Sequence, residues 1–250
     1  MAVLIVAGFS FGYYRSLAET SNQVDWGYEG EYNADQWGLL SNEFESCRIG
    51  RNQSPINLSS INNNPSRKSA EIKFNYQSSA VEVVNNGHTI VVNYGEGSSV
   101  LIDNKEYALK QFHFHTPSEH TIDNEASAME VHFVHQNDAG EIAVVGAMIN
   151  SGEENPLIAR VWQAIPDGNK AHKNQKMELN AIDLLPKNKT YFSYQGSLTT
   201  PPCSEDVSWN LLLEPIEVSS PQIATFSNIF SYNARPIQSL NGRLIELRED

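Results

Sequence analysis

Short stretches in which hydrophobic and polar residues alternate follow one another along most of this chain. Alternation with a period of two is typical of a β-strand that buries one of its faces. Turn-forming sequences, among them Asn86-Gly87 and Ser151-Gly152, lie between several of these stretches. The pattern predicts strands over residues 71–76, 80–85, 89–94, 99–102, 107–115, 128–135, 142–149 and 207–213.

Two segments carry hydrophobic residues at helical spacing instead. Asn155-Pro156 is typical of a helix start, because asparagine caps the first turn and proline is favoured at the first helical position. Ser220-Pro221 predicts a second start of the same kind. We therefore expect a mainly β, mixed α+β fold, in which one large, mostly antiparallel central sheet and a few surface helices form a single domain.

The composition argues against several classes of function. The chain has 250 residues, and with 40% of them hydrophobic it can build a sizeable core. Its net charge of -13 argues against a nucleic-acid-binding protein and against adhesion to anionic membranes. The sequence contains neither the P-loop motif nor the dinucleotide-binding glycine motif. A protein that acts on a small molecule fits these features best.

The N-terminus has the pattern of an export signal. Residues 1–11 are apolar except for Ser10, a run too short to span a bilayer, so we expect no stable membrane insertion. Ser16-Leu-Ala18 is a small-x-small cleavage pattern, although no Lys or Arg precedes the apolar run. We predict a signal peptide over residues 1–18, a domain over 19–250, and a periplasmic or secreted protein. A buried N-terminal strand is the alternative.

Two cysteines, Cys47 and Cys203, lie far apart in the sequence. In a reducing compartment they would be two unrelated buried thiols. In an exported protein an even pair favours a disulfide. Export and the disulfide therefore support each other.

Three histidines have the spacing of a metal site. In Gln111-Phe-His-Phe-His115, alternation places His113 and His115 on one face of a strand. His132 lies in a second alternating run, and His135, three positions later, faces the other way. If the two strands pair, three imidazoles converge, and three histidines with one open position are the ligand set of a catalytic zinc. An ordinary polar strand face is the alternative.

A second kind of metal site fits part of the same pattern. His113 and His115, with Glu119 four positions after His115, match the core of the cupin ligand set, which binds iron or manganese in oxygenases. The glycines expected around that set are absent, because positions 107 and 126 are Tyr107 and Ala126.

Six motifs together resemble the α-class carbonic anhydrases, in that family's order and spacing. The resemblance covers nearly the whole chain, from about Trp26 to Arg243, and the cysteine positions resemble the secreted bacterial members. The motifs are Gln53-Ser-Pro-Ile-Asn57, Asn85-Asn-Gly-His88, Gln111-Phe-His-Phe-His115, Ser118-Glu-His120, Glu130-Val-His-Phe-Val-His135 and Gly196-Ser-Leu-Thr-Thr-Pro-Pro202.

The resemblance implies Zn2+ on His113, His115 and His132, and hydration of CO2 to bicarbonate and a proton by zinc-bound hydroxide. It implies that Gln111 and Glu130 accept hydrogen bonds from ligand histidines. It assigns Glu119 and Thr199 to orienting the hydroxide, and Thr200 to the bicarbonate end. The residues that the resemblance places in an apolar CO2 pocket are Val134, Val144, Leu198, Val207 and Trp209.

Proton release is the last role that the resemblance implies. His88 matches the family's proton shuttle, a role for which a side chain that titrates near neutral pH is suited. Tyr28, Asn85 and Asn86 match the residues that order the intervening water. A solvent-facing turn histidine is the alternative for His88.

Two further expectations follow from the resemblance. Bacterial members are often dimers, so a homodimer is compatible with the sequence, although it reveals no interface. Carbonic-anhydrase-like domains that have lost a zinc ligand serve as binding modules. Here all three ligand histidines, Glu119 and Thr199 are retained, which argues against that alternative.

Overall fold

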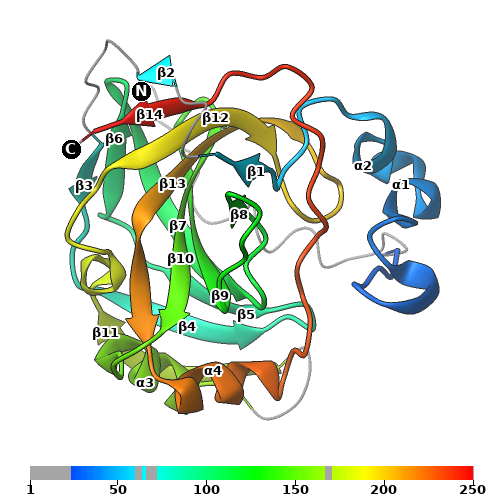
Figure 1. Cartoon of the computed structure of the whole chain (residues 1–250). Helices are drawn as coiled ribbons and strands as arrows, with labels where there is room; N and C mark the ends of the chain where they lie inside the picture. The colour runs from blue at the N-terminus through cyan, green and yellow to red at the C-terminus, as the bar shows by residue number, and fades with distance from the viewer. Residues whose placement is uncertain (1–23, 60–63, 66–71, 167–170, 250) are drawn as a thin grey trace, which may run out of the picture.

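The computed structural model describes residues 24–59, 64–65, 72–166 and 171–249, and within them one 12-stranded sheet dominates (Figure 1). Its strands are β2 (Asn64–Pro65), β3 (Lys73–Asn75), β4 (Ser79–Asn85), β5 (Ile90–Tyr94), β6 (Ser99–Ile102), β7 (Lys105–His115), β9 (Met129–Gln136), β10 (Ile142–Ser151), β11 (Ala171–Leu179), β12 (Tyr191–Ser197), β13 (Glu205–Val218) and β14 (Glu246–Arg248).

The strand order is β11-β4-β5-β7-β9-β10-β13-β12-β14-β2, with β6 paired to both β3 and β7. Most neighbours are antiparallel, which confirms the predicted sheet. β10 and β13 are parallel, as are β14 and β2. A parallel pair needs a long crossover, and the chain between β10 and β13 includes a helix and two strands. A separate parallel pair consists of β1 (Asn57–Leu58) and β8 (Thr121–Ile122).

The sequence pattern did not predict β11 and β12. β11 carries mostly polar residues at the edge of the sheet, so it has little hydrophobic alternation. β12 contains Gly196, which resembles a turn signal but lies inside the strand. A Cβ atom at Gly196 would lie 2.2 Å from Ser54 Oγ and 2.8 Å from Trp209 Cδ1, so glycine permits this close approach.

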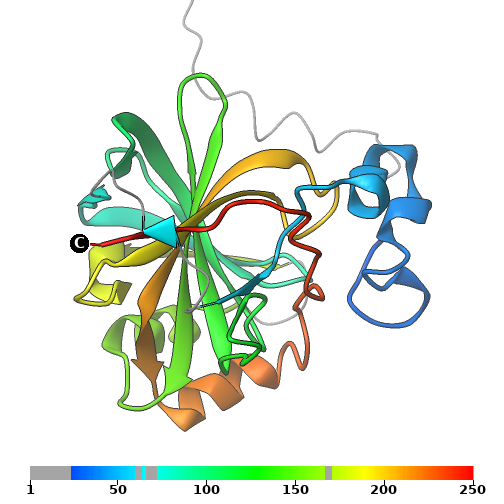
Figure 2. The same ribbon diagram turned by 45° about the horizontal axis from the view of Figure 1, so that its top comes forward.

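Two helices lie side by side at one end of the sheet, α3 (Pro156–Gln163) and α4 (Ser220–Ser227), as Figure 1 and Figure 2 show. The Asn155 side chain accepts hydrogen bonds from the first turn of α3, which confirms the predicted cap. The predicted start of α4 was wrong by one residue. Ser219 is the cap, because its side chain and that of Gln222 form a reciprocal capping box.

The N-terminal part of the described chain forms short helical segments that stand to one side of the sheet in both views. The fully buried Trp37 stabilises this part by donating from Nε1 to the carbonyls of Gly27 and Tyr32. No helix in the described residues is both long and apolar enough to cross a membrane. The short segments are η2 (Gly30–Tyr32), α1 (Trp37–Leu40), η3 (Asn42–Phe44) and α2 (Ser46–Ile49), and η4 (Ala181–Leu184) lies between β11 and β12.

The two faces of the central strands have different neighbours. Phe112, Phe114 and Phe133 are fully buried on one face, in the larger hydrophobic cluster that also receives α3 and α4. Burying each such ring stabilises the fold by about 1.5–3 kcal/mol. The other face of β7 and β9 carries His113, His115 and His132 and is flanked by a second, smaller cluster around Trp209. Aromatic packing on the opposite face therefore fixes the two strands that hold these three histidines.

Candidate metal centre and active site

Strand register brings the three histidines together. β7 and β9 pair antiparallel, with His113 opposite His132 and His115 opposite Glu130. Residues directly opposite each other share a face of the sheet, and so do residues two apart on one strand. His113, His115 and His132 therefore project from the same face, and one ring nitrogen of each lies within 4.8 Å of the others.

The second nitrogen of each histidine has a protein partner. His113 Nδ1 lies 2.8 Å from Gln111 Oε1, and His132 Nε2 lies 2.8 Å from Glu130 Oε1. His115 Nδ1 lies 2.7 Å from the backbone oxygen of Asn233. Such partners fix both the tautomer and the orientation of a ligand histidine. They leave Nε2 of His113, Nε2 of His115 and Nδ1 of His132 to face the shared point.

A buried atom without a partner shows that this point suits a metal ion. His115 Nε2 is buried and has no hydrogen-bond partner in the described structure. Most buried polar atoms are satisfied, so an unpaired nitrogen aimed at two other imidazoles fits a missing ligand. Three nitrogen donors are a set that zinc prefers. The residues present therefore fit a zinc ion.

Glu130 links this cluster to the chain around it. Its Oε1 accepts from His132 and His120, and its Oε2 accepts from the backbone N–H groups of Glu119 and His120. Burial raises the pKa of Glu130, but the two histidines outweigh it and the net pKa lies well below the usual range. His120 Nε2 lies 2.6 Å from the Tyr194 hydroxyl, so both nitrogens of His120 are used within the protein. His120, Glu130 and His132 are thus a hydrogen-bonded support and not a second metal site.

The charge states of the ligand histidines follow from burial and from the carboxylates beside them. Burial lowers the pKa of His113 well below its usual value, and the neighbouring histidines add to the effect. Burial also lowers the pKa of His115, against an opposing contribution from Glu119. Burial alone would lower the pKa of His132, but Glu130 more than offsets it, and the net pKa is raised. Neutral imidazoles, the form that binds metal, are therefore favoured at His113 and His115.

Glu119 is buried beside the histidine cluster. Its Oε1 accepts from the backbone N–H of Arg235 at 2.8 Å. Its Oε2 has no hydrogen-bond partner and lies 3.5 Å from His115 Nε2 and 3.9 Å from His132 Nδ1. The carboxylate thus keeps an unused acceptor next to the metal position. Thr199 is also buried, in the loop between β12 and β13, and a hydrogen bond from its hydroxyl to Glu119 stays a prediction.

The predicted pocket residues come together on the histidine side of the sheet. Val134, Val144 and Trp209 lie in one row across β9, β10 and β13. Val207 and Leu198 belong to the same hydrophobic cluster, in which Val134 and Leu198 are only partly buried. The Trp209 ring centroid lies 4.8 Å from that of His132. These side chains form an apolar wall beside the cluster, with the half-buried Thr200 on the adjoining loop.

His88 lies in the turn between β4 and β5 and is partly exposed. Its ring stacks on Trp26, with centroids 3.7 Å apart and planes 5° apart. Asn85 Oδ1 accepts from the backbone of Gly87, and Asn86 Oδ1 accepts from the backbone of His88. Both asparagine oxygens therefore build the turn, and their expected role in ordering water stays a prediction. No sequence motif indicated the stack on Trp26.

Tyr28 lies in an aromatic group with Trp26 and Trp37. Burial raises the pKa of Tyr28 well above its usual value, and the Glu119 carboxylate adds to the effect. Tyr28 therefore stays a neutral phenol, electrostatically coupled to the site.

Comparison with known proteins identifies the family. A profile of eukaryotic-type carbonic anhydrases matches residues 32–249. The chain belongs to the carbonic anhydrase family. A carbonic anhydrase of Pectobacterium atrosepticum is 41% identical, with 98% of this chain and 97% of the relative covered. The α-carbonic anhydrase of Thermovibrio ammonificans, solved with the inhibitor sulfanilamide, is 42% identical with a TM-score of 0.87, and covers 90% of this chain and 100% of that one.

Family membership indicates the class of reaction. Bacterial relatives that are 41% identical over nearly their full length are carbonic anhydrases. The chain is thus an enzyme of the carbonic anhydrase type, and the family supports CO2 hydration. The fold also occurs in dioscorin, solved in complex with ascorbate, at 29% identity and a TM-score of 0.80, covering 90% of this chain and 98% of that one.

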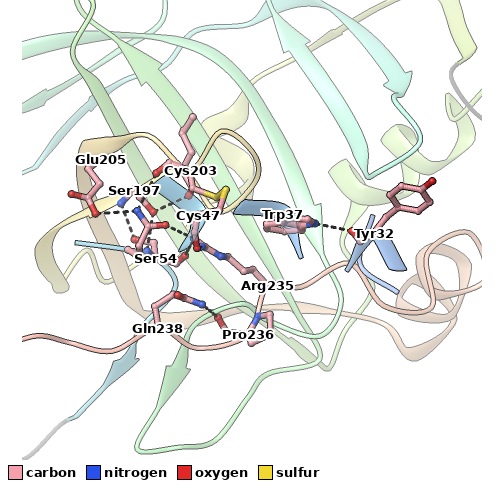
Figure 3. Close-up of a disulfide and its surroundings, with 12 residues drawn as sticks. Tyr32, Trp37, Cys47, Ser54, Ser197, Cys203, Glu205, Arg235, Pro236 and Gln238 are labelled. Carbon is pink, nitrogen blue, oxygen red and sulfur yellow. Dashed lines mark hydrogen bonds between the residues drawn. A yellow bond between two sulfur atoms is a disulfide. The ribbon is translucent and has the colours of Figure 1, made fainter. Parts of the chain in front are cut away.

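In this carbonic anhydrase a disulfide ties the N-terminal segments to the loop beside the site. Cys47 and Cys203 are joined (Figure 3). In the sequence Cys203 closely follows Thr199 and Thr200. The buried Arg235 donates from Nη2 to the Cys47 carbonyl and from Nη1 to the Gln53 side chain. Gln53 in turn donates to the Cys203 carbonyl. The loop that carries both threonines is therefore anchored covalently and by buried hydrogen bonds.

Sequence reasoning missed two residues of the site, Asn233 and Arg235. Both contribute through the backbone, Asn233 through the carbonyl that faces His115 and Arg235 through the N–H that faces Glu119. A backbone group has no residue-type signature, so a motif search has nothing to detect. The predicted signal peptide lies outside the described residues.

Proposed function

We propose that this protein catalyses the zinc-dependent, reversible hydration of CO2 to bicarbonate and a proton. His113, His115 and His132 would hold the zinc ion, and a fourth position would remain open for the reaction. One observation carries the proposal. Three imidazole nitrogens, from the partly buried His113 and the buried His115 and His132, converge within 4.8 Å while their second nitrogens are each held by an acceptor.

Zinc in a three-histidine site supplies hydroxide at neutral pH by lowering the pKa of water to about 7, a value established for carbonic anhydrases as a class. The chain's own part is to fix the ligands and orient the nucleophile. Thr199 donates a hydrogen bond from its hydroxyl to the free Glu119 Oε2. Its oxygen can then only accept a hydrogen bond from the nucleophile. The buried, unpartnered Oε2 supports this assignment, because it needs a donor.

The substrate is small and uncharged, so it requires an apolar surface with few polar groups. Val144, Val207 and Trp209, buried beside His132, supply that surface, with Val134 and Leu198 at its more exposed side. Thr200 lies on the loop next to Thr199 and would contact the bicarbonate product. The negative charge that develops on the product would also favour its release from an apolar pocket.

The proton produced by each turnover has to leave the site. His88 is the proposed carrier, because it is partly exposed and histidine is the side chain whose ordinary pKa suits proton transfer near neutral pH. Tyr28, Asn85 and Asn86 would order the water between His88 and the metal position. The stack of His88 on Trp26 favours one orientation of the imidazole.

A cupin-type oxygenase is not proposed. The third histidine and the family both argue against it, and one Glu119 oxygen is bound by the backbone of Arg235. Export to the periplasm or beyond is proposed with the enzyme, because the Cys47–Cys203 disulfide suits an oxidising compartment. Cell fractionation tests this, and an exclusively cytoplasmic, reduced protein would contradict it. A homodimer stays a prediction.

The test of the proposed function is a stopped-flow CO2 hydration assay with zinc quantified on the same sample. We expect one zinc per chain and hydration at neutral pH that a chelator abolishes. Thr199→Ala should keep its zinc and lose about a hundredfold in activity, an effect typical of removing one group that orients the reacting atoms. Thr225→Ala, on the exposed side of α4, is the matched control and should be unaffected. Zinc-loaded protein without hydration, or full activity without zinc, would refute the proposal.

Replacing His88 tests the proton carrier. His88→Ala should slow turnover in weak buffer by at least about tenfold, because proton release becomes limiting. Strong buffer or added imidazole should restore the rate, while the zinc content stays unchanged. Equal loss in weak and strong buffer would mean that another group carries the proton.

A further inference from the structure

Asn233, in the segment that follows α4, is fully buried and makes contact with three parts of the site. Its Oδ1 accepts from the backbone N–H of Thr116 at 2.7 Å. Its Nδ2 donates to the backbone oxygens of His88 and Phe114, both at 3.0 Å. Its backbone N–H donates to the Thr116 oxygen at 3.0 Å. Its backbone oxygen faces His115 Nδ1 at 2.7 Å.

These partners leave no freedom in how the amide is oriented. Two carbonyl oxygens face Nδ2, and one N–H group faces Oδ1. Exchanging the amide oxygen and nitrogen would therefore set like groups against each other at all three contacts. Both Nδ2 hydrogens are used, each by one carbonyl. The fully buried side chain thus acts as a rigid three-point link.

The link holds the peptide group that orients a ligand histidine. The direction of the Asn233 carbonyl follows from the orientation of its peptide plane, because that plane is rigid. Two hydrogen bonds to Thr116, one from the side chain and one from the backbone, and the bond to Phe114 fix Asn233 against the end of β7. The same strand end carries His115, so donor and acceptor of the His115–Asn233 bond are held in one frame.

The third contact reaches the turn that carries His88. The His88 carbonyl accepts one Nδ2 hydrogen while the Phe114 carbonyl accepts the other. Thr89 strengthens the connection by donating from Oγ1 to the same Phe114 oxygen at 2.5 Å. One side chain therefore connects the backbone of His88 to the strand that carries His113 and His115.

We propose that the Asn233 side chain is a positioning residue that fixes the carbonyl facing His115 and, with the same amide, the backbone of His88. Loss of the amide then disturbs metal retention and proton release together. The inference rests on the proposed function, in which His115 is a zinc ligand and His88 carries protons. It adds a residue whose side chain touches neither the metal position nor the substrate pocket.

Two substitutions separate the contacts. Asn233→Asp keeps an acceptor for Thr116 but loses the paired donors to His88 and Phe114, whereas Asn233→Ala loses all three contacts. Asn210→Ala is the matched control, because Asn210 is an equally buried asparagine on β13, whose side chain contacts Ser193, Ser208 and Val144 and no ligand histidine. It should lower thermal stability without changing zinc release.

The first readout is zinc dissociation into excess chelator, measured on the full chain. We expect dissociation from Asn233→Ala to be about tenfold faster than from the wild type, at the lower end of the effects seen when metal-site support is removed. The second readout is hydration in weak and strong buffer, where both Asn233 variants should lose more activity in weak buffer. Folded variants that release zinc within twofold of the wild type would overturn the inference.

A measurement on the unaltered protein covers the case in which the variants do not fold. In metal-free wild-type protein, the Asn233 side-chain amide and the His115 Nδ1–H should both be strongly protected from hydrogen exchange by NMR. Rapid exchange of the Asn233 amide would overturn the inference. Wild-type protein that fails to bind one zinc would instead refute the proposed function, so the two failures are distinguishable.

Discussion

Two histidines on the same strand, His132 and His135, are equally buried yet have opposite surroundings. His132 uses Nε2 to contact Glu130 and turns Nδ1 towards two other histidines. His135, on the other face of β9, has its Nε2 2.7 Å from the Tyr76 hydroxyl and its Nδ1 3.3 Å from the Ala143 carbonyl. Burial therefore does not distinguish a metal ligand from a core histidine. What distinguishes them is whether one ring nitrogen is left for an external partner.

The two rings also differ in the charge of the groups that contact them. Burial lowers the pKa of His135 to about 3, and the hydrogen bonds to the Ala143 and Phe133 backbone offset only part of this effect. At His132 the Glu130 carboxylate outweighs burial and raises the pKa. The negative charge of the Glu130 carboxylate favours a cation bound to the His132 ring, and a zinc ion is such a cation. The apolar face holds a neutral ring with two neutral partners.

The largest expected difference between the two faces is in metal binding. His132→Ala should lose stoichiometric zinc and all measurable hydration, because two ligands cannot replace three. His135→Ala should keep one zinc per chain, although its free energy of unfolding should fall by about 2–5 kcal/mol through the cavity and the unpaired Tyr76 hydroxyl. Zinc analysis and chemical denaturation measure both effects. Zinc loss of equal extent in the two variants would contradict the comparison.

The acid sensitivity of the fold gives the second difference. Below pH 6.5 the unfolded chain protonates His135, while the folded protein keeps it neutral down to about pH 3, so falling pH favours unfolding. Between pH 7.5 and 4.5 this one ring should cost about 3 kcal/mol of unfolding free energy. His135→Phe should reduce the slope of stability against pH by about 1.4 kcal/mol per unit between pH 6 and 4. Identical slopes in urea denaturation would refute this assignment.

The smallest expected effect concerns the support of one ligand. Gln111→Ala removes the acceptor at His113 Nδ1 and should weaken zinc binding by about tenfold. Gln111→Glu keeps a carbonyl-type oxygen at the same place and should restore most of the affinity. Competition with a zinc chelator measures both constants. If alanine and glutamate weaken binding equally, the Gln111 contact does not orient His113.

Alternation in the sequence was enough to predict the histidine face. A strand inverts its side chains with a period of two, so His113 and His115 had to share a face whatever the rest of the fold. The pattern left open whether the strands of His113 and His132 pair, and the register of β7 with β9 shows that they do. The mostly antiparallel sheet and the cap at Asn155 were predicted for equally local reasons.

Other parts of the site depend on contacts between distant segments, which local patterns do not encode. The Asn233 carbonyl reaches His115 across 118 positions of the sequence. Alternation along β9 was enough to place His132 and His135 on opposite faces. The hydrogen-bond partners of His135 are Tyr76 and Ala143, which come from other segments of the chain. β12 was missed because Gly196, a turn signal in isolation, is required inside a strand by close packing.

The most direct test of the account is a zinc titration of metal-free protein in which all histidine rings are labelled with nitrogen-15. We expect saturation at one equivalent, with large shifts at Nε2 of His113, Nε2 of His115 and Nδ1 of His132. The ring signals of His135 should hardly change. Binding without saturation at one equivalent, a ligand histidine whose ring does not respond, or an equal response at His135 would contradict the three-histidine metal centre.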